Sequence, residues 1–355
     1  MRRVHPVWVV LVAAAALLAG LAGGTWLRPA GGTVGPGARG SSVLSITAAG
    51  LLDAAFPTVA AVLANETPSI SVPGAAQQYQ GSLQALEAVS QLHEPFDVAA
   101  SADFRLIPEL LEPANARWEV LFATSPLVLA YDPASSALRG INASNWPALL
   151  DRPGVLLGVA NASTDPDGFN AIFALELEGL LTQGNLSSLY GHFFSGAPGS
   201  LAQPNPSDTR LVPETSAGTE LAQGDIQAYF LYQAYATTHH LSYVALSPAV
   251  DLGNFSAPDL QFYAKASTSI LGPSGPELVQ GAPIAFSATV PENAPNATLG
   301  ELFVHLLLTP VGAQVLLAQG FQPIAPGYVQ GPGPLPPYLA PLTAPLPAVL
   351  SAEIP

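Results

Sequence analysis

The sequence predicts an α/β protein of two lobes, each built on a doubly wound parallel sheet, with the chain crossing between them. Short apolar segments of strand character alternate with segments of helical periodicity, which indicates parallel sheets covered by helices. About half of the 355 residues are hydrophobic (49%), which is enough for a substantial core. A longer apolar stretch at 120–132 could be the strand that carries the chain from one lobe to the other.

Three strands alternating with three helices are expected at the start of the first lobe. The strands are expected at 43–50, 69–75 and 96–103, and the helices at 51–66, 82–92 and 104–111. Ser82 stands where the second helix begins, so its hydroxyl is expected to cap that helix.

A second series of alternating elements follows. Its expected segments are 154–160, 168–181, 225–238 and 242–247, then a strand at 283–290 and terminal helices within 298–320 that break at Pro310. We predict that lobe 1 comprises 43–122 and 263–330 and that lobe 2 comprises 123–262. Ligands of open α/β sheets bind beyond the carboxyl ends of strands, so the strand-to-helix turns are the candidate positions.

The charge and the cysteine content exclude several function classes. Charged residues make up 10% of the chain, well below the roughly 25% of ordinary soluble domains. The formal net charge is -15, so polyanions are poor partners and we expect no nucleic-acid partner. Cysteine is absent, which excludes disulfides, thiol catalysis, zinc–thiolate sites and iron–sulfur clusters.

The two ends of the chain differ from the predicted lobes. Arg2 and Arg3 precede an apolar run, and we expect 1–27 to be an export signal, with an uncleaved N-terminal anchor as the alternative. Residues 28–42 are expected to form a flexible linker, and 331–355 a proline-rich C-terminal tail. The protein is therefore expected at the cell surface or outside the cell, tethered if the apolar segment is retained.

Asn-x-Ser/Thr sequons recur along the chain and fit an outward-facing, glycosylated surface. They begin at Asn65, Asn142, Asn161, Asn185, Asn254 and Asn296. The alternative is that a chain rich in Asn, Ser and Thr produces sequons by chance.

Several longer motifs occur in a fixed order. They include FDVAASADFRLIPELL at 96–111, NWPALLDRPGVLLGVANASTDPDGFNA at 145–171, and PETSAGTELAQGDIQAYFLYQAYATTHHLSYVALS at 213–247. In order, spacing and number, these motifs resemble the periplasmic-binding-protein-like (type II) solute receptors of molybdate/tungstate ABC transporters, especially their archaeal tungstate-binding branch. The resemblance covers most of 43–337. It implies a ligand in the cleft between the lobes, a molybdate or tungstate ligand without a cofactor, and an ABC permease as partner; we expect a monomer.

The resemblance also implies which residues form the site. By position in the motifs, Asp165 and Glu214 correspond to two carboxylates that approach the molybdenum or tungsten atom and expand its coordination. Two like charges about 4 Å apart repel by roughly 4 kcal/mol at an effective dielectric constant of about 20, so these carboxylates must be protonated or act as ligands of the hard metal centre. Hydrogen-bonding positions are implied at three turns and one tyrosine: Gly50, Leu51, Gly81, Ser82, Ser101, Ala102 and Tyr232.

Three of these residues also have a purely structural interpretation. Asp165 can be a turn residue that caps the following helix, Glu214 a solvated acid at a helix start, and Tyr232 a core residue. An additional acid, Asp167, follows Asp165; we expect it to cap the helix and assign it no ligand role.

The chain departs from the family pattern at three further positions. Leu51 stands where the family has a serine, Asn170 replaces an arginine, and Gln227 replaces an aspartate. These departures leave molybdate, tungstate and another tetrahedral oxyanion such as sulfate open as the ligand.

No motif in the sequence points to catalysis. Neither a G-x-S-x-G nucleophile elbow nor a phosphate-binding loop occurs. His239 and His240 are adjacent, do not share a helix face and lack a third ligand at metal-site spacing, so we expect them at a surface or a helix end. We therefore expect a receptor and not an enzyme, with a cell-surface sensory or structural protein that kept the fold as the alternative.

Overall fold

The computed structural model describes residues 42–67, 69–272 and 275–351. The expected export signal (1–27) and the expected linker up to residue 41 lie outside the described residues. The described residues belong to one compact unit. Two large sheets, which take their strands from different stretches of the chain, dominate its described part.

The larger sheet has seven strands in the order β18-β17-β6-β16-β5-β2-β4. Their bounds are β2 (Ile46–Ala49), β4 (Gln77–Gln80), β5 (Val98–Ser101), β6 (Glu119–Thr124), β16 (Ala285–Thr289), β17 (Gln322–Gln330) and β18 (Thr343–Pro345). β2 runs parallel to both β4 and β5, whereas β16 is antiparallel to β5 and β6. The sheet is therefore mixed, and the prediction of a parallel sheet is wrong for its centre, although β2, β4 and β5 form the expected parallel group.

The smaller sheet has five strands in the order β11-β8-β12-β7-β13. Their bounds are β7 (Leu127–Tyr131), β8 (Leu157–Val159), β11 (Thr209–Leu211), β12 (Ala228–Tyr232) and β13 (Tyr243–Ala245). β8 runs parallel to β11 and β12, whereas β7 is antiparallel to β12 and β13. Both sheets thus contain a parallel group of three strands, and each group has its carboxyl ends at one edge.

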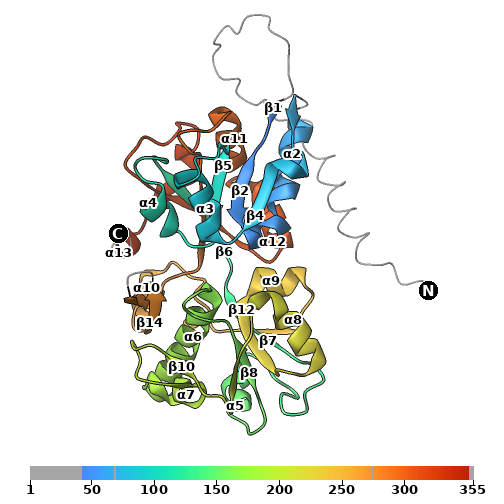
Figure 1. The fold of residues 1–355 in the computed structure, drawn as a ribbon, viewed down its shortest axis with the longest axis vertical. Helices are drawn as coiled ribbons and strands as arrows, with labels where there is room; N and C mark the ends of the chain where they lie inside the picture. Colours follow the sequence, from blue (N-terminus) through green and yellow to red (C-terminus); the bar gives the residue numbers. More distant parts are fainter. Residues whose placement is uncertain (1–41, 68, 273–274, 352–355) are drawn as a thin grey trace, which may run out of the picture. The chain divides into compact units, whose positions relative to one another are not determined.

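Helices cover both sheets (Figure 1). Around the seven-stranded sheet lie η1 (Gly50–Ala54), α2 (Phe56–Glu66), α3 (Ser82–Ser90), α4 (Leu106–Leu110), α11 (Ala297–Leu307) and α12 (Pro310–Ala318). Around the five-stranded sheet lie α5 (Trp146–Leu150), α6 (Pro166–Gln183), α7 (Ser187–Phe193), α8 (Glu214–Gln223) and α9 (Gln233–Thr238). The shorter elements are β1 (Ser42–Val43), β3 (Ile70–Ser71), η2 (Gly74–Ala76), β9 (Phe194–Ser195), β10 (Gln203–Pro204), α10 (Ala257–Tyr263), η3 (Ala340–Leu342) and α13 (Ala348–Ser351).

The packing of α2 shows how the apolar pattern builds the core. The buried residues of this helix follow the spacing of one face: Phe56, Val59, Ala60 and Leu63. The ring of Phe56 lies 5.8 Å from that of Phe122 in β6 and 5.0 Å from that of Phe303 in α11. Burying one such side chain contributes about 1.5–3 kcal/mol. Every residue of β6 and of β12 is buried, as expected for strands covered on both faces.

The stretch at 120–132 crosses between the two sheets as two strands. β6 ends at Thr124 in the larger sheet, and β7 begins at Leu127 in the smaller one. Two hydrogen bonds join the segments that cross: the Leu127 N–H donates to the Asp251 carbonyl at 2.7 Å, and the Ile284 N–H donates to the Leu252 carbonyl at 2.8 Å. The outgoing and returning crossings therefore lie side by side.

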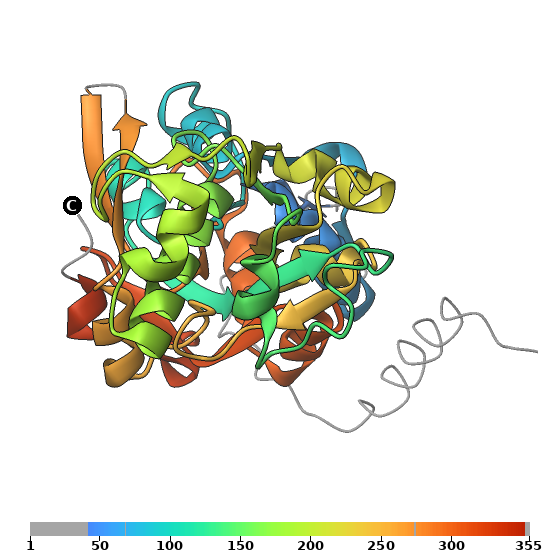
Figure 2. The ribbon, with the colours of Figure 1, turned by 90° about the horizontal axis from the view of Figure 1, so that it is seen from below.

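Two contacts refine the predicted lobe ranges. The hairpin of β14 (Ser267–Gly272) and β15 (Gly275–Gln280) packs against α6, and the Ser267 N–H donates to Glu176 Oε2 at 2.9 Å. Figure 2 shows this orange hairpin beside the green α6. The hairpin lies in the range predicted for lobe 1, and the buried Glu176 carboxylate joins it to α6, a helix of the smaller sheet. Within the expected tail (331–355), β18 pairs in parallel with β17 and so extends the larger sheet.

Within 42–67, 69–272 and 275–351, no single helix is long and apolar enough to cross a membrane. Taken together, α11 and α12 meet that requirement by length and composition, but the pair is bent by 69°.

Candidate ligand-binding site

Six candidate residues follow the carboxyl ends of three adjacent strands in the larger sheet. β2 and β4 end in register at Ala49 and Gln80, and β5, which pairs with β2, ends at Ser101. We call these six residues the donor edge: Gly50, Leu51, Gly81, Ser82, Ser101 and Ala102. The fold brings them together at the kind of sheet edge where α/β proteins bind ligands.

Ser82 does not cap α3, so the expected capping role is wrong. The N-cap residue is Gly81, whose backbone is extended, and Ser82 is already the first helical residue. The Ser82 Oγ instead accepts the backbone N–H of Ala102 at 3.1 Å and so ties the turn after β4 to the turn after β5. A hydroxyl that accepts a hydrogen bond keeps its own proton to donate, so Ser82 can still bind an anion.

Two other residues of the donor edge are used mainly within the protein. The Ser101 hydroxyl is buried, donates to the Asp103 carbonyl at 2.7 Å and accepts the Asp103 N–H at 3.0 Å. Leu51 is partly buried and packs against the main core as well as an apolar cluster around the smaller sheet that includes Val128 and Val212. Where the family has a serine, this chain therefore has an apolar contact that joins the two lobes.

The candidate residues of the smaller sheet occupy the equivalent edge. β8 and β11 end in register at Val159 and Leu211, and β12 lies on the other side of β8. The segment after β8 leads to Asp165 at the start of α6, and the segment after β11 leads to Glu214, the first residue of α8. Tyr232 ends β12. Both sheets thus present their candidate residues by the same topological rule.

The structure exchanges the roles expected for the two acids of the Asp-Pro-Asp segment. Asp165 is the N-cap residue of α6, and its Oδ1 accepts the Asp167 N–H at 3.0 Å. Asp167, the expected cap, is fully buried, and within the described ranges neither of its carboxyl oxygens has a hydrogen-bond partner. The reason is Pro166, which occupies the first helical position, where its missing N–H costs nothing, and so makes Asp165 the cap.

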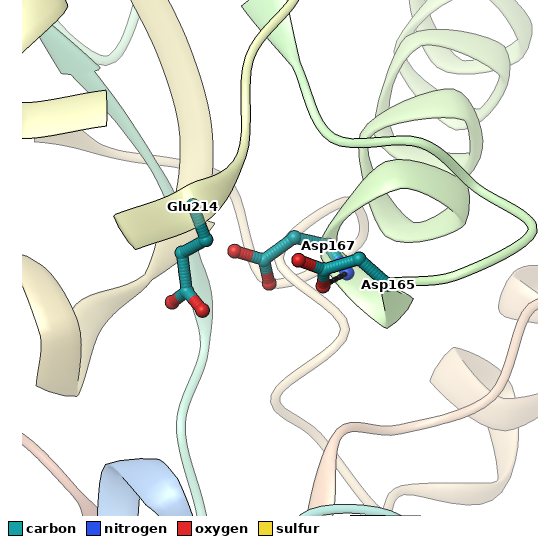
Figure 3. Close-up of side chains that lie close together, drawn as sticks. All are labelled: Asp165, Asp167 and Glu214. Carbon is teal, nitrogen blue, oxygen red and sulfur yellow. Dashed lines mark hydrogen bonds between the residues drawn. The ribbon is translucent and has the colours of Figure 1, made fainter. Parts of the chain in front are cut away.

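Asp165, Asp167 and Glu214 form what we call the carboxylate cluster. One carboxyl oxygen from each lies within 4.8 Å of the others. Figure 3 shows the two aspartates at the start of α6 and the glutamate at the start of α8, with the Asp167 carboxyl between the other two. The Glu214 Oε1 is also buried without a hydrogen-bond partner in the described part of the chain. The fold therefore brings together the two predicted acids and adds a third.

Burial and mutual repulsion favour the protonated forms of these three groups. Burial raises the pKa of Asp167 well above its ordinary value, the charges of Glu214 and Asp165 raise it further, and the nearby Tyr232 hydroxyl opposes the rise. Burial followed by the charge of Asp165 raises the pKa of Glu214 to about 7. Burial also raises the pKa of Asp165, while the N–H of Asp167 lowers it. The cluster must be neutralised by protons or by a bound ligand.

Tyr232 lies beside the cluster and is held by the residue that replaces the family arginine. The Asn170 Nδ2 donates to the Tyr232 hydroxyl at 3.3 Å, and both side chains are buried. The Tyr232 ring makes an edge contact with Phe286, whose centroid is 6.4 Å away. The core-packing and ligand-binding interpretations of Tyr232 are therefore compatible, because its ring packs while its hydroxyl faces polar neighbours.

A cavity adjoins the cluster and takes its lining from both lobes. Its empty volume is about 310 Å³, part of which is open to solvent. Ala102 and Arg105 line it from the donor-edge side, and Pro166, Asn170 and Tyr232 line it from the cluster side. The carboxyl groups of the cluster are not part of this lining, so the cavity leads toward them and does not contain them.

Arg105 is a site residue that the sequence analysis missed. Its Nε lies 2.9 Å from Asp103 Oδ1 and its Nη2 lies 2.8 Å from Asp103 Oδ2, so the pair is bidentate. Burial alone would raise the pKa of Asp103, but the charge and hydrogen bonds of Arg105 outweigh burial and lower it. The signal was an arginine two residues after a predicted strand, in a chain with only 10 Lys and Arg residues.

Gln227 and His239 have structural roles. The Gln227 side chain accepts the Leu156 N–H at 2.8 Å and donates to the Gly224 carbonyl at 2.9 Å, so it fixes the turn before β12. His239 is exposed at the end of α9, lies 3.0 Å from the Tyr235 carbonyl through Nδ1 and stacks on the Tyr235 ring. His239 therefore lies at a helix end, as predicted.

Curated relatives cover most of the chain. A protein of Methanoculleus marisnigri described as an uncharacterized solute-binding protein is 29% identical over 92% of this chain and 95% of its own length. The molybdate/tungstate-binding protein WtpA of Thermococcus kodakarensis is 29% identical over 67% of this chain and 69% of its own length.

The fold is that of known receptors. The substrate-binding domain of a putative molybdenum ABC transporter from Clostridium difficile has a TM-score of 0.53 at 15% identity, with 80% of this chain and all of that chain (100%) covered. This likeness confirms the predicted two-lobe α/β fold. Residues 44–322 match the family described as bacterial extracellular solute-binding protein. Because the match covers most of the chain, including the smaller sheet and both candidate edges, the chain belongs to the family of bacterial extracellular solute-binding proteins.

Proposed function

We propose that the protein captures molybdate or tungstate outside the cell and delivers it to an ABC permease. The observation that carries the proposal is the pair of matching sheet edges, one with neutral donors and one with the carboxylate cluster. The name of the Thermococcus kodakarensis relative, a molybdate/tungstate-binding protein, supports this choice of ligand. The family supports a receptor, and we extend this to a protein without enzymatic activity or cofactor.

Neutral donors suit a tetrahedral dianion because they need no buried cation. In our proposal Gly81 and Ser82 present the start of α3, a helix of nine residues, and its free N–H groups attract negative charge. The Ser82 hydroxyl adds a donor, and the backbone N–H groups of Gly50 and Leu51 lie at the neighbouring turn. The donor edge then binds the oxygens of the anion.

The cluster would act on the central atom. Mo(VI) and W(VI) are hard acids that accept oxygen ligands, so ionised Asp165 and Glu214 can bind the metal directly and not repel the oxyanion. Sulfur and phosphorus do not expand their coordination in this way, so ligation would select against sulfate and phosphate. Tyr232 would donate to an oxygen from the cluster side, held in place by Asn170.

Closure of the lobes would complete the site. The neighbouring crossings at 124–127 and near 252–284 supply a hinge, and ligand contacts from both edges would favour the closed form. We propose that the receptor works as a monomer that is exported to the cell surface or beyond, and that it stays tethered there only if the N-terminal apolar segment is retained. The exposed positions of Asn65, Asn142, Asn161 and Asn185 leave those sequons open to glycosylation.

Calorimetric titration with tungstate, molybdate, sulfate and phosphate tests the proposal. We expect tight binding of tungstate and molybdate, and a loss of at least about tenfold in tungstate affinity for each of Asp165→Ala and Glu214→Ala. Asp225→Asn, which changes an exposed acid after α8, serves as the control. Unchanged affinity in both cluster variants would refute direct ligation, preferential binding of sulfate would replace the ligand, and the absence of any oxyanion binding would refute the function.

A further inference from the structure

We propose that the carboxylate cluster is also a site for a hard cation of calcium size, which the cleft holds when no oxyanion is bound. The ligands are the carboxyl groups of Asp165, Asp167 and Glu214. This inference does not depend on the proposed function, because it concerns a ligand of opposite charge.

The separation of the three carboxyl groups fits a single ion. Calcium takes six to eight oxygen ligands at about 2.3–2.6 Å, so two oxygens on one ion are at most about 5 Å apart. The cluster offers one oxygen from each acid, all within 4.8 Å of one another. The spacing therefore brings all three acids close to the distance that a single ion requires, so that small movements of the side chains would let them bind the same ion.

The state of Asp167 provides the independent observation. Its side chain is fully buried and lies between the other two acids, yet in the described part of the chain no hydrogen bond reaches either of its carboxyl oxygens. A buried carboxylate without a partner is costly, and a bound cation removes that cost. Asp165 differs from Asp167 in this respect, since its Oδ1 already accepts the Asp167 N–H.

The surroundings offer oxygen donors and few positive charges. The ion pairs found in the described ranges are made by other acids, among them Asp103 and Glu220. The Tyr232 hydroxyl lies near Asp167 and can add a neutral oxygen or bind a water of the ion. Asn170, which bonds to Tyr232, is neutral, so the charge of the three acids is balanced either by protons or by a bound cation.

The cation and the oxyanion would exclude each other. Asp165 and Glu214 cannot bind both a cation and the metal centre of an oxyanion, so we infer that the cation occupies the open receptor and leaves when the oxyanion binds. Asp167 is a proposed ligand of the cation and not of the oxyanion, so its substitution distinguishes cation binding from oxyanion binding.

The experiment is a titration of the full-length protein with terbium, a hard cation of calcium size whose emission is sensitised by nearby tyrosine. Tyr232 beside the cluster is the expected sensitiser. We expect saturable, tyrosine-sensitised emission that calcium reverses. Asp167→Asn should weaken terbium binding at least about tenfold, because it replaces one charged ligand with a neutral side chain of similar shape. Asp225→Asn should bind terbium as the unaltered protein does.

The outcomes are decisive in both directions. Circular dichroism checks that Asp167→Asn is folded, and Glu214→Gln is titrated beside it as a second cluster variant. The proposal is overturned if terbium emission does not saturate, or if both cluster variants bind terbium as tightly as Asp225→Asn. Tungstate is titrated separately, because calcium tungstate is insoluble. Terbium binding without tungstate binding would remove the proposed function and keep this inference, and the reverse result would do the opposite.

Discussion

The donor edge and the carboxylate cluster occupy equivalent positions in the two lobes but differ in how their polar groups are satisfied. In the donor edge, the Ala102 N–H is accepted by Ser82 and the Ser101 hydroxyl is used by Asp103. In the cluster, Asp167 is buried with its carboxyl oxygens unpaired among the described residues, and the Glu214 pKa is raised to about 7. The serine side chains of the donor edge are therefore paired within the protein, whereas the Asp167 carboxyl group of the cluster is not paired in the described part of the chain.

This difference predicts which polar groups should supply the free energy of ligand binding. A set of groups that already satisfy one another gains little from a ligand, whereas unpaired buried groups regain what burial costs them. The cluster should therefore determine affinity and selectivity, and the donor edge should orient the ligand.

The largest expected effect is a difference in tungstate affinity between variants of Glu214 and Ser82. Glu214→Ala should lower tungstate affinity by roughly 100-fold, about 2.7 kcal/mol, because it removes a proposed ligand of the metal centre. Ser82→Ala should lower affinity by less than about tenfold, because it removes one hydrogen bond. Isothermal titration calorimetry measures both. A larger effect for Ser82→Ala would reverse the assignment of the two edges.

A smaller effect, on the free energy of unfolding, is expected from substituting Gly168 and Gly81, the glycines beside the two sites. A Cβ on Gly168, in the first turn of α6, would lie 2.5 Å from the Ala162 nitrogen and 2.6 Å from the Ala160 carbonyl oxygen. A Cβ on Gly81 would lie no closer than 3.6 Å to its neighbour, a flexible glutamine side chain. Gly168→Ala should therefore lower the free energy of unfolding by about 1–3 kcal/mol, and Gly81→Ala by much less. Urea unfolding tests this, and equal losses would contradict it.

The pH dependence of stability distinguishes the effect of burying a single acid from the effect of crowding several acids together. Burial raises the pKa of Glu176, on the same helix as the two aspartates, from its ordinary value of 4.5 to about 7. The folded form therefore binds this proton more tightly than the unfolded form. The free energy of unfolding should fall by about 1 kcal/mol per pH unit as pH rises between these two values.

Glu176→Gln should flatten that part of the stability profile, whereas Glu66→Gln, at an exposed position in α2, should leave it unchanged. Urea unfolding at several pH values between about 4 and 8 measures the slope. A slope that is the same in both variants would mean that the crowded cluster, and not burial of single acids, controls the pH response.

The smallest expected effect concerns Leu51. Leu51→Ser restores the family hydroxyl and should raise tungstate affinity by about two- to tenfold, since a hydrogen bond to an anion contributes roughly 0.5–1.5 kcal/mol or slightly more. It should also lower the free energy of unfolding by about 1 kcal/mol, because Leu51 packs against both apolar clusters. Calorimetry and urea unfolding measure the two changes. A gain in stability would contradict the packing role of Leu51.

Much of the site could be predicted because topology places it. Alternation of strands and helices predicted which turns lie at the carboxyl ends of strands, and the structure places six candidate residues at one such edge and Asp165, Glu214 and Tyr232 at the other. The order and spacing of the motifs predicted the family. Whether these residues bind the oxyanion stays a prediction.

Other features could not be predicted, because they depend on distances of a few ångströms between remote segments. The sequence of Asp-Pro-Asp contained the reason why Asp165 is the cap, since proline favours the first helical position. Only the tertiary structure decided that Asp167 points at Glu214, because that contact needs α6 and α8 side by side. The same holds for Arg105, whose place in the cavity depends on the position of the opposite lobe.

The sequence by itself therefore determined the fold class, the family and the two edges, because apolar periodicity and turn positions are properties of the chain read in order. Only the tertiary structure decided which polar groups satisfy each other and which do not. That balance depends on burial: the same carboxyl group is unremarkable in water, but fully enclosed at Asp167 it requires a proton, a cation or a ligand.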